Sequence, residues 1–306
     1  METLSELVDV VRKKRGAVIM AVLNTTPDSF FDGGKYFDHH GAQQGIERAL
    51  REGADIIDVG AESTRPGAKP ISPQEQIDRA GPAICHAVRC GAAVSIDTTS
   101  SIVALEALRL GATIVNDVSC LANEKLASVT AAANGDLIIM HSRGSMTTMS
   151  GFSQCAENEY KDVVRDVFEE WSQARERAIS AGLQKSRIWF DPGLGFHKNA
   201  EHCHEIMRRL HEFQELEAPI LLGPSRKSFI GQLDQSPADK RLGGTIAACL
   251  HALQAGVKIL RVHDVHDVSQ AVRAFEAWSP PLMQKQLRPV PHSSSGINQA
   301  SGALRA

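Results

Sequence analysis

The segment ILLGPSRKSFIG, residues 220–231, ends a short apolar run with two adjacent cations. The run is typical of a buried strand, and Gly223 and Pro224 are typical of the turn that ends one. Arg226 and Lys227 follow directly. Guanidinium and ammonium groups form strong hydrogen bonds with phosphate oxygens, so the segment is a candidate phosphate site.

Polar residues end the other apolar runs as well. They are Asn24, Asp97, Asn116 with Asp117, His141, Asp191, and Arg261 with His263 and Asp264, while Asp58 lies within the second run. One aspartate after a strand is usually a helix cap. Caps do not require arginine, lysine or histidine, so we interpret the whole set as one functional site.

The acidic and amide side chains of this set indicate what the site binds. Asp97, Asn116 and Asp191 carry oxygens that accept hydrogen bonds from a polar heterocycle with several N–H groups. These three residues are therefore a candidate heterocycle site.

The remaining polar side chains suit an anion. Arg65, Arg261 and His263 supply donors that can hold phosphate oxygens. Asn24 is a neutral oxygen ligand of the kind that Mg²⁺ uses when it also contacts phosphate. The sequence thus predicts a heterocycle and a phosphate-bearing group side by side.

Eight apolar runs must position these residues. They lie at 17–23, 55–60, 93–97, 113–117, 136–141, 187–191, 219–223 and 258–263. They lack the alternation of a half-exposed antiparallel sheet, which favours parallel strands covered on both faces. Segments with helical spacing separate them, the clearest at 160–182. The pattern predicts an α/β fold, a single-domain (β/α)8 TIM barrel, with the polar residues on the face where the strands end.

A doubly wound open sheet is the alternative fold. No G-x-G-x-x-G follows the first apolar run, which disfavours the dinucleotide-binding form of that fold. Within the barrel interpretation we expect an N-terminal helix at 1–16, the barrel at 17–278 and a flexible C-terminal tail at 279–306. The tail is rich in proline and serine and has no acidic residue.

The composition argues against several classes of partner. A net charge of −3 gives no basic footprint for nucleic acid or an acidic membrane surface. No apolar run reaches the roughly 18 residues of a membrane span, and the N-terminus lacks the apolar region of a signal peptide. None of the six cysteines forms a C-x-x-C pair, so we expect a cytoplasmic protein with reduced thiols.

Three histidines lie close together in the segment HKNAEHCH, residues 197–204. A metal site is the weaker interpretation, because the spacing of His197, His202 and His204 fits neither a helix face nor a strand. We expect the solvated start of a helix there.

An ordered set of motifs identifies a family. LNTTPDSFFDGG, GAESTRPGA, SIDT, IVND, MH, DPGLGF, GPSRKSFIG and RVHD occur in the order and at the strand positions of dihydropteroate synthase. The resemblance covers about 17–278. Single pieces such as DPG are unspecific, but the ordered set is very specific.

The resemblance implies a reaction. Enzymes of this family join (7,8-dihydropterin-6-yl)methyl diphosphate to 4-aminobenzoate, release diphosphate and form 7,8-dihydropteroate, a folate precursor. The family implies a cytoplasmic transferase that uses Mg²⁺ and forms homodimers.

The resemblance also implies roles for single residues. Asp97, Asn116, Asp191 and Lys227 would hold the pterin. Asn24, Thr64, Arg65, Arg261 and His263 would hold the diphosphate, with Asn24 also on the metal. Phe30, Asp32, Arg65, Pro66 and Ser225 would frame 4-aminobenzoate. Asp97, Lys227, Arg261 and His263 would act in catalysis, and Asp97 would stabilise the positive charge of the pterin methylene.

These implied roles divide the two adjacent cations. Lys227 would face the pterin, whereas Arg226 is expected to be structural and to pair with a carboxylate that the sequence does not name. The chain departs from the common family pattern at Thr25, Phe31, Leu194 and His197. The residues implied to hold the pterin are all present.

Two rival functions remain open at this point. A pterin-binding methyltransferase domain shares the barrel and the pterin carboxylates, but it has no need for STRPG, SRK and RVH together. A non-catalytic pterin-binding homologue would show a broken site, and no residue of the mapped set is missing.

Overall fold

The computed structural model describes residues 3–14, 16–26, 39–62, 70–144 and 155–279. Eight parallel strands form one sheet in the order β6-β5-β4-β3-β2-β1-β8-β7. They are β1 Val18–Asn24, β2 Ile56–Gly60, β3 Ala93–Asp97, β4 Ile114–Asp117, β5 Asp136–Met140, β6 Ile188–Asp191, β7 Leu221–Leu222 and β8 Ile259–Val262. A single bridge between Phe190 and Ile220 joins β6 to β7 and nearly closes the sheet into a barrel. The predicted TIM barrel is confirmed.

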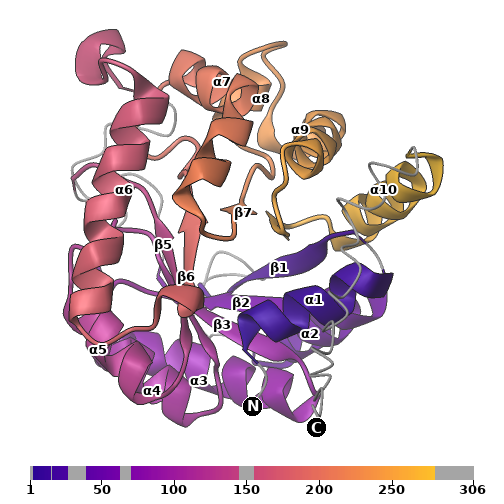
Figure 1. Ribbon diagram of the computed structural model, residues 1–306. Helices are drawn as coiled ribbons and strands as arrows, with labels where there is room; N and C mark the ends of the chain where they lie inside the picture. The colour runs from indigo at the N-terminus through magenta and orange to yellow at the C-terminus, as the bar shows by residue number, and fades with distance from the viewer. Residues whose placement is uncertain (1–2, 15, 27–38, 63–69, 145–154, 280–306) are drawn as a thin grey trace, which may run out of the picture.

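Apart from α1, which covers one end of the barrel, the described helices surround the strands on the outside (Figure 1). The helices are α1 Leu4–Lys14, α2 His39–Glu52, α3 Pro73–Arg89, α4 Ser101–Arg109, α5 Lys125–Ala132, α6 Val163–Ser180, α7 Ala200–Arg208, α8 Ser228–Gly231, α9 Leu242–Gln254 and α10 Val265–Trp278. Short 3-10 helices lie at Glu157–Glu159, Lys185–Arg187, Leu210–Leu216 and Ala238–Lys240. No helix of the described ranges is long and apolar enough to cross a membrane.

Local sequence explains where helices begin and where strands follow. Asp162 caps α6 by accepting from the backbone N–H groups of Val164 and Arg165. The joints from helix to strand at Gly53, Gly111 and Gly256 have φ of 106°, 107° and 91°. Glycine adopts this left-handed region without the steric cost that a side chain brings.

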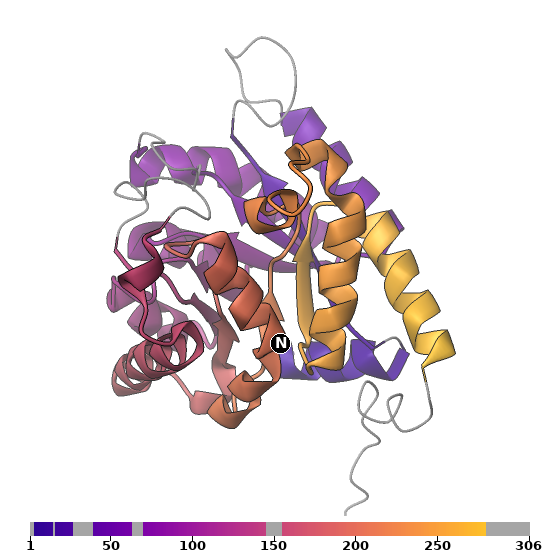
Figure 2. The same cartoon turned by 90° about the horizontal axis from the view of Figure 1, so that it is seen from above.

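The barrel interior is apolar at the amino ends of its strands. Leu4, Val8 and Val11 of α1 pack against Val18 of β1 and Ile259 of β8 in one buried cluster. The backbone N–H of Leu4 also donates to Asp136 Oδ2 at 2.9 Å. Helix α1 therefore covers this end of the barrel (Figure 2), and the polar residues gather at the opposite end.

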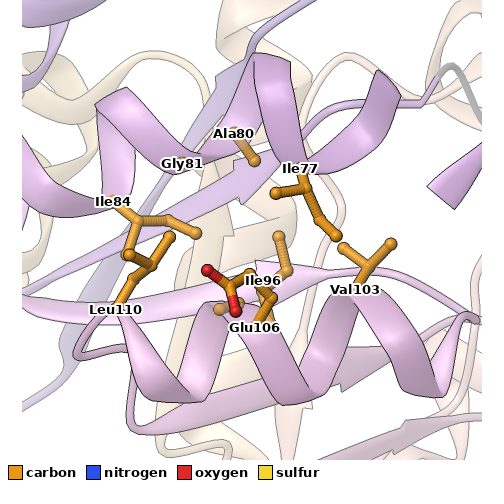
Figure 3. Close-up of a pocket in the computed structure, with 9 residues that line it drawn as sticks. Ile77, Ala80, Gly81, Ile84, Ile96, Val103, Glu106 and Leu110 are labelled. Carbon is orange, nitrogen blue, oxygen red and sulfur yellow. The ribbon is translucent and has the colours of Figure 1, made fainter. Parts of the chain in front are cut away.

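A second, larger core lies between the strands and the outer helices. Figure 3 shows part of it, where apolar side chains of α3 and α4 face one another across a gap of about 170 Å³. Ile77, Ile84 and Leu110 line this gap together with Ile96 of β3. Glu106 is the one charged residue of the lining, and its carboxylate pairs with Arg109; the other lining residues are apolar, so the gap is an imperfection of core packing.

Candidate active site

A pocket lies over the carboxyl ends of the strands, where TIM barrels carry their chemistry. Its volume is about 360 Å³, open solvent included. It is lined by Asp97, Asn116, Val118, Met140, Asp191, Gly193, Leu194, Phe196, Gly223, Lys227 and Arg261. The structure therefore brings together all four residues expected to hold the pterin, with Arg261 among them.

Arg261 joins two carboxylates in the floor of this pocket. Its Nη2 lies 2.8 Å from Asp97 Oδ2, and its Nε lies 2.7 Å from Asp58 Oδ2. Asp58 Oδ2 also accepts from Asn116 Nδ2 at 3.3 Å. Because both donors share one oxygen, Asp58 fixes the guanidinium and the amide relative to each other.

Asp58 belongs to the polar set of the sequence, but neither its residue type nor the resemblance gave it a role in the site. Its side chain is fully buried, and its second carboxylate oxygen has no hydrogen-bond partner among the described residues. The available signal was an acidic residue inside the buried run DIIDVG. A buried charge needs a partner, and only the fold shows that the partner is Arg261.

Burial shifts the pKa values of the charged groups in the pocket. It raises the pKa of Asp97 to about 7, against the attraction of Arg261. It also raises the pKa of Asp191, and it lowers the pKa of Lys227 to about 8 although Asp191 opposes the change. A ligand with matching donors and acceptors would replace the hydrogen bonds to water that burial takes from these charges.

Asn24 lies beside Asp97 at the end of β1. Asn24 Oδ1 and Asp97 Oδ2 both lie within 4.0 Å of the point where a Cβ on Gly60 would sit. Asn24 also lines a second cavity of about 870 Å³, open solvent included, together with Arg226 and His263. The expected diphosphate residues thus divide, with Arg261 in the first cavity and Asn24 and His263 in the second.

Ser225 and His263 form a hydrogen-bonded pair. Ser225 Oγ accepts from the backbone N–H of His263 at 3.2 Å and lies 3.0 Å from its Nδ1. Desolvation of the ring, together with the charges of Arg261 and Arg226, lowers the pKa of His263 to about 4. His263 is therefore a neutral donor at neutral pH, and the buried Ser225 hydroxyl is engaged with it.

The two adjacent cations take different directions. Arg226 Nε lies 3.0 Å from Asp264 Oδ2, and its Nη2 lies 2.5 Å from Oδ1. Lys227 lines the pocket, and its Nζ lies 4.0 Å from the centre of the Phe196 ring. Asp264 is the carboxylate that the sequence did not name. The helix after them, α8, has only four residues.

Several expected site residues lie outside the described residues. They are Phe30, Asp32, Thr64, Arg65 and Pro66, together with the departure at Phe31. The other departures are placed. Leu194 lines the pocket, His197 Nδ1 lies 2.9 Å from Ser142 Oγ, and Thr25 Oγ1 donates to Gly60 O at 3.1 Å.

The described ranges hold no group of three His, Cys, Asp or Glu side chains able to bind a metal. His202 instead forms a capping box with Asn199 at the start of α7, in agreement with the expected helix start. Mg²⁺ often takes only one or two protein oxygens and completes its shell with water and substrate phosphate. Asn24, with the Asp97 carboxylate nearby, fits an ion that arrives with a phosphate ligand.

Comparisons with known proteins agree with this geometry. Residues 20–263 match the family described as pterin binding enzyme. The chain is 38% identical over 263 residues to the dihydropteroate synthase of Haemophilus influenzae, which covers 85% of this chain and 93% of that protein.

Solved structures give the same result. A Clostridium difficile dihydropteroate synthase, solved in the presence of pteroic acid, has a TM-score of 0.78 and 40% identity over 87% of this chain and 97% of its own. A Xanthomonas albilineans dihydropteroate synthase with 4-aminobenzoic acid has a TM-score of 0.79 and 34% identity over 86% of this chain and 94% of its own. With this fold, this pocket and these relatives, the chain belongs to the dihydropteroate synthase family of pterin-binding enzymes.

Proposed function

We propose that the pocket binds the pterin of (7,8-dihydropterin-6-yl)methyl diphosphate and that the enzyme transfers its pterinylmethyl group to 4-aminobenzoate. The products are 7,8-dihydropteroate and diphosphate. The observation that carries this proposal is the single pocket lined by Asp97, Asn116, Asp191, Lys227 and Arg261. Family membership supports the same reaction.

Pterin binding follows from the hydrogen-bonding character of the pocket. The pterin ring carries several N–H donors and one carbonyl, which match the carboxylates of Asp97 and Asp191, the amide of Asn116 and the ammonium of Lys227. Met140 and Phe196 offer apolar surface to the faces of the ring. A planar, polar heterocycle is therefore the ligand that this lining suits.

The reaction breaks the methylene–oxygen bond and forms a methylene–nitrogen bond. The diphosphate leaves with the electron pair, the amine nitrogen of aminobenzoate attacks the methylene carbon, and its surplus proton passes to solvent. In its ionised form Asp97 stabilises the positive charge that develops on the pterin. We assign the diphosphate oxygens to Arg261 and to the neutral donor His263; the contact of Arg261 with Asp58 and that of His263 with Ser225 fix their side chains.

Asn24 would hold a Mg²⁺ ion that the diphosphate also binds, and such an ion neutralises charge on the leaving group. The chain's own part is to orient the diphosphate between Arg261, on the floor of one cavity, and the rim residues Asn24 and His263. We assign aminobenzoate to the rim near Ser225, with Phe30, Asp32, Arg65 and Pro66 contributing as the resemblance implies. Thr64 and Arg65 would contact the diphosphate.

We further propose that the enzyme is a cytoplasmic homodimer whose single catalytic domain is the barrel at 17–278. The resemblance and the absence of a C-x-x-C pair among the cysteines support this assignment. Sedimentation of the purified protein tests the dimer, and a monomer at micromolar concentration would contradict it.

The decisive experiment is pteroate formation by purified protein with both substrates and Mg²⁺. We expect pteroate and diphosphate in equal amounts. The product must require both substrates and must decrease when Mg²⁺ is chelated. Diphosphate release without pteroate would contradict the transfer to aminobenzoate.

A further inference from the structure

Behind one wall of the pocket lies a second buried lysine, Lys198, in the loop that joins β6 to α7. Its side chain is fully buried. Its Nζ lies 2.9 Å from His141 Nδ1 and within 3.3 Å of the backbone carbonyls of His141, Gly193 and Phe196. An ammonium has three N–H donors, so the protein itself satisfies this cation completely.

The carbonyls that Lys198 binds belong to the segment that lines the pocket. Gly193, Leu194 and Phe196 all contribute to the lining, and the Phe196 ring packs under Lys227 Nζ. The backbone N–H of Gly193 donates to Asp191 Oδ1 at 2.8 Å. The Lys198 ammonium therefore fixes the backbone that orients two of the pterin-binding candidates.

The same loop packs against β5 with little room. Gly193 has φ +67°, and a Cβ there would lie 2.0 Å from the backbone oxygen of His141. Lys198 bonds to carbonyls on both sides of this contact, His141 on one side and Gly193 on the other. It thus holds the loop and the strand end together where their backbones touch.

The charges around Lys198 form a closed chain. His141 Nδ1 accepts from Lys198, so the ring is the Nε2–H tautomer and donates to Glu170 Oε2 at 2.9 Å. Desolvation, with the charge of Lys198, lowers the pKa of His141 to about 3, so the ring stays neutral. Arg143 also binds Glu170. Every member of the network Lys198–His141–Glu170–Arg143 thus has a partner within it.

We propose that Lys198 is a positioning residue for pterin binding. It acts through the backbone of Gly193 and Phe196 and does not touch the ligand. This inference rests on the proposed function, because it names the pterin as the molecule whose affinity depends on the loop. Ser225 lies after β7, outside this loop, so aminobenzoate binding should not depend on Lys198.

The test compares Lys198→Met with a matched control, Lys185→Met. Methionine keeps the apolar stem of lysine and removes the charge. Lys185 is an exposed lysine that pairs with Glu217 at 3.3 Å and lies away from the pocket. We expect the KM for the pterin diphosphate to rise at least tenfold in Lys198→Met, with less than a threefold change in the KM for aminobenzoate. The control should leave both KM values unchanged.

A merely structural role would not produce this split. It would lower the melting temperature or the active fraction and leave both KM values alike. A pterin KM within twofold of wild type in folded Lys198→Met would overturn the proposal. If Lys198→Met does not yield folded protein, Lys198→Gln decides by the same split: its uncharged amide has two N–H donors for the four acceptors around Lys198, so part of these contacts is lost and the pterin KM alone should still rise. Failure of both variants to fold would also overturn it, because Lys198 would then serve the fold.

Direct binding separates this inference from the proposed function. Calorimetry with 6-hydroxymethylpterin measures the effect of Lys198→Met without turnover. If wild type forms no pteroate but binds the pterin tenfold more tightly than Lys198→Met does, the proposed reaction fails while the positioning role stands. If wild type and Lys198→Met bind the pterin equally and wild-type turnover is normal, the positioning role of Lys198 fails while the proposed reaction stands.

Discussion

Two neighbouring regions use similar charged side chains for different purposes: the pocket, which a ligand can enter, and the network Lys198–His141–Glu170–Arg143 behind its wall, whose charges pair with one another. In the pocket, Lys227 lies over an aromatic ring and faces a cavity, and burial raises the pKa of Asp97 to about 7. In the network, Lys198 is surrounded by four acceptors of the protein. Burial alone would raise the pKa of Glu170 there, but the hydrogen bonds from His141 and Arg143 lower it to about 2.

The difference teaches how a buried cation is assigned to binding or to structure. Burial costs both lysines hydration, and it lowers the pKa of each to about 8. Lys198 regains these interactions from backbone carbonyls, whereas Lys227 lines a cavity in which a ligand can contact it. A buried charge that lines a cavity indicates binding, and one enclosed by backbone carbonyls indicates positioning.

The largest effect is expected from Asp97→Asn in the pocket. Asparagine keeps the shape but cannot carry the charge that stabilises the pterin methylene, so turnover should fall by about 10²–10³-fold. Diphosphate release measured by a coupled assay gives the rate, and circular dichroism checks the fold. Near-normal turnover would remove Asp97 from its proposed role.

Lys227→Met should come next. It removes the ammonium that we assign to the pterin, so pterin affinity should fall by about 10–100-fold, since a charge-assisted hydrogen bond is worth about 1.5–3 kcal/mol. Calorimetry with 6-hydroxymethylpterin measures this directly. If Lys227→Met binds the pterin normally, Lys227 does not bind the ligand, and the assignment of Lys227 to binding and Lys198 to positioning is wrong.

In the closed network, His141→Gln tests the pH dependence of stability. The pKa of His141 is lowered to about 3 in the folded protein, whereas an unfolded histidine titrates near its ordinary value. Between these pH values the unfolded state binds more protons, so wild-type stability should fall as pH decreases. The charged groups that face the ring are Lys198, Arg143 and Glu170. All three stay charged between pH 5 and pH 7.

Between pH 7 and pH 5 the free energy of unfolding should therefore fall by about 1–2 kcal/mol less in His141→Gln than in wild type. Urea unfolding of both proteins at each pH measures it. Identical slopes for wild type and His141→Gln would mean that His141 does not stay neutral in the folded state.

The smallest effect is expected from Arg226→Ala. Arg226 is 42% exposed and its ion pair with Asp264 is screened by solvent, so the pair is worth about 0.2–1 kcal/mol. Stability should fall by that order and pterin affinity should not change. A large loss of pterin affinity in Arg226→Ala, with none in Lys227→Met, would reverse the division between the two cations.

Much of the fold was predictable because local patterns define it. Seven of the eight predicted apolar runs contain an observed strand, and β1 extends one residue past the other run; the polar residues of these runs lie at one end of the barrel. Lys227 lines the pocket and Arg226 pairs with a carboxylate, as the division of the two cations expects, and the pterin contact of Lys227 stays a prediction. Parallel strands covered on both faces leave a strong apolar signal, and the motifs stand in a fixed order along it.

The sequence by itself determined the barrel, the family and the polar residues Asp97, Asn116, Asp191, Lys227 and Arg261 that line the pocket. Only the tertiary structure decided the partners: Asp58 with Arg261 across 203 positions, Lys198 with His141 across 57, and Arg226 with Asp264 across 38. It also decided that the Ser225 hydroxyl is engaged with His263. The physical reason is that burial makes a charge require a partner, while the sequence does not show which distant side chain the barrel brings within reach.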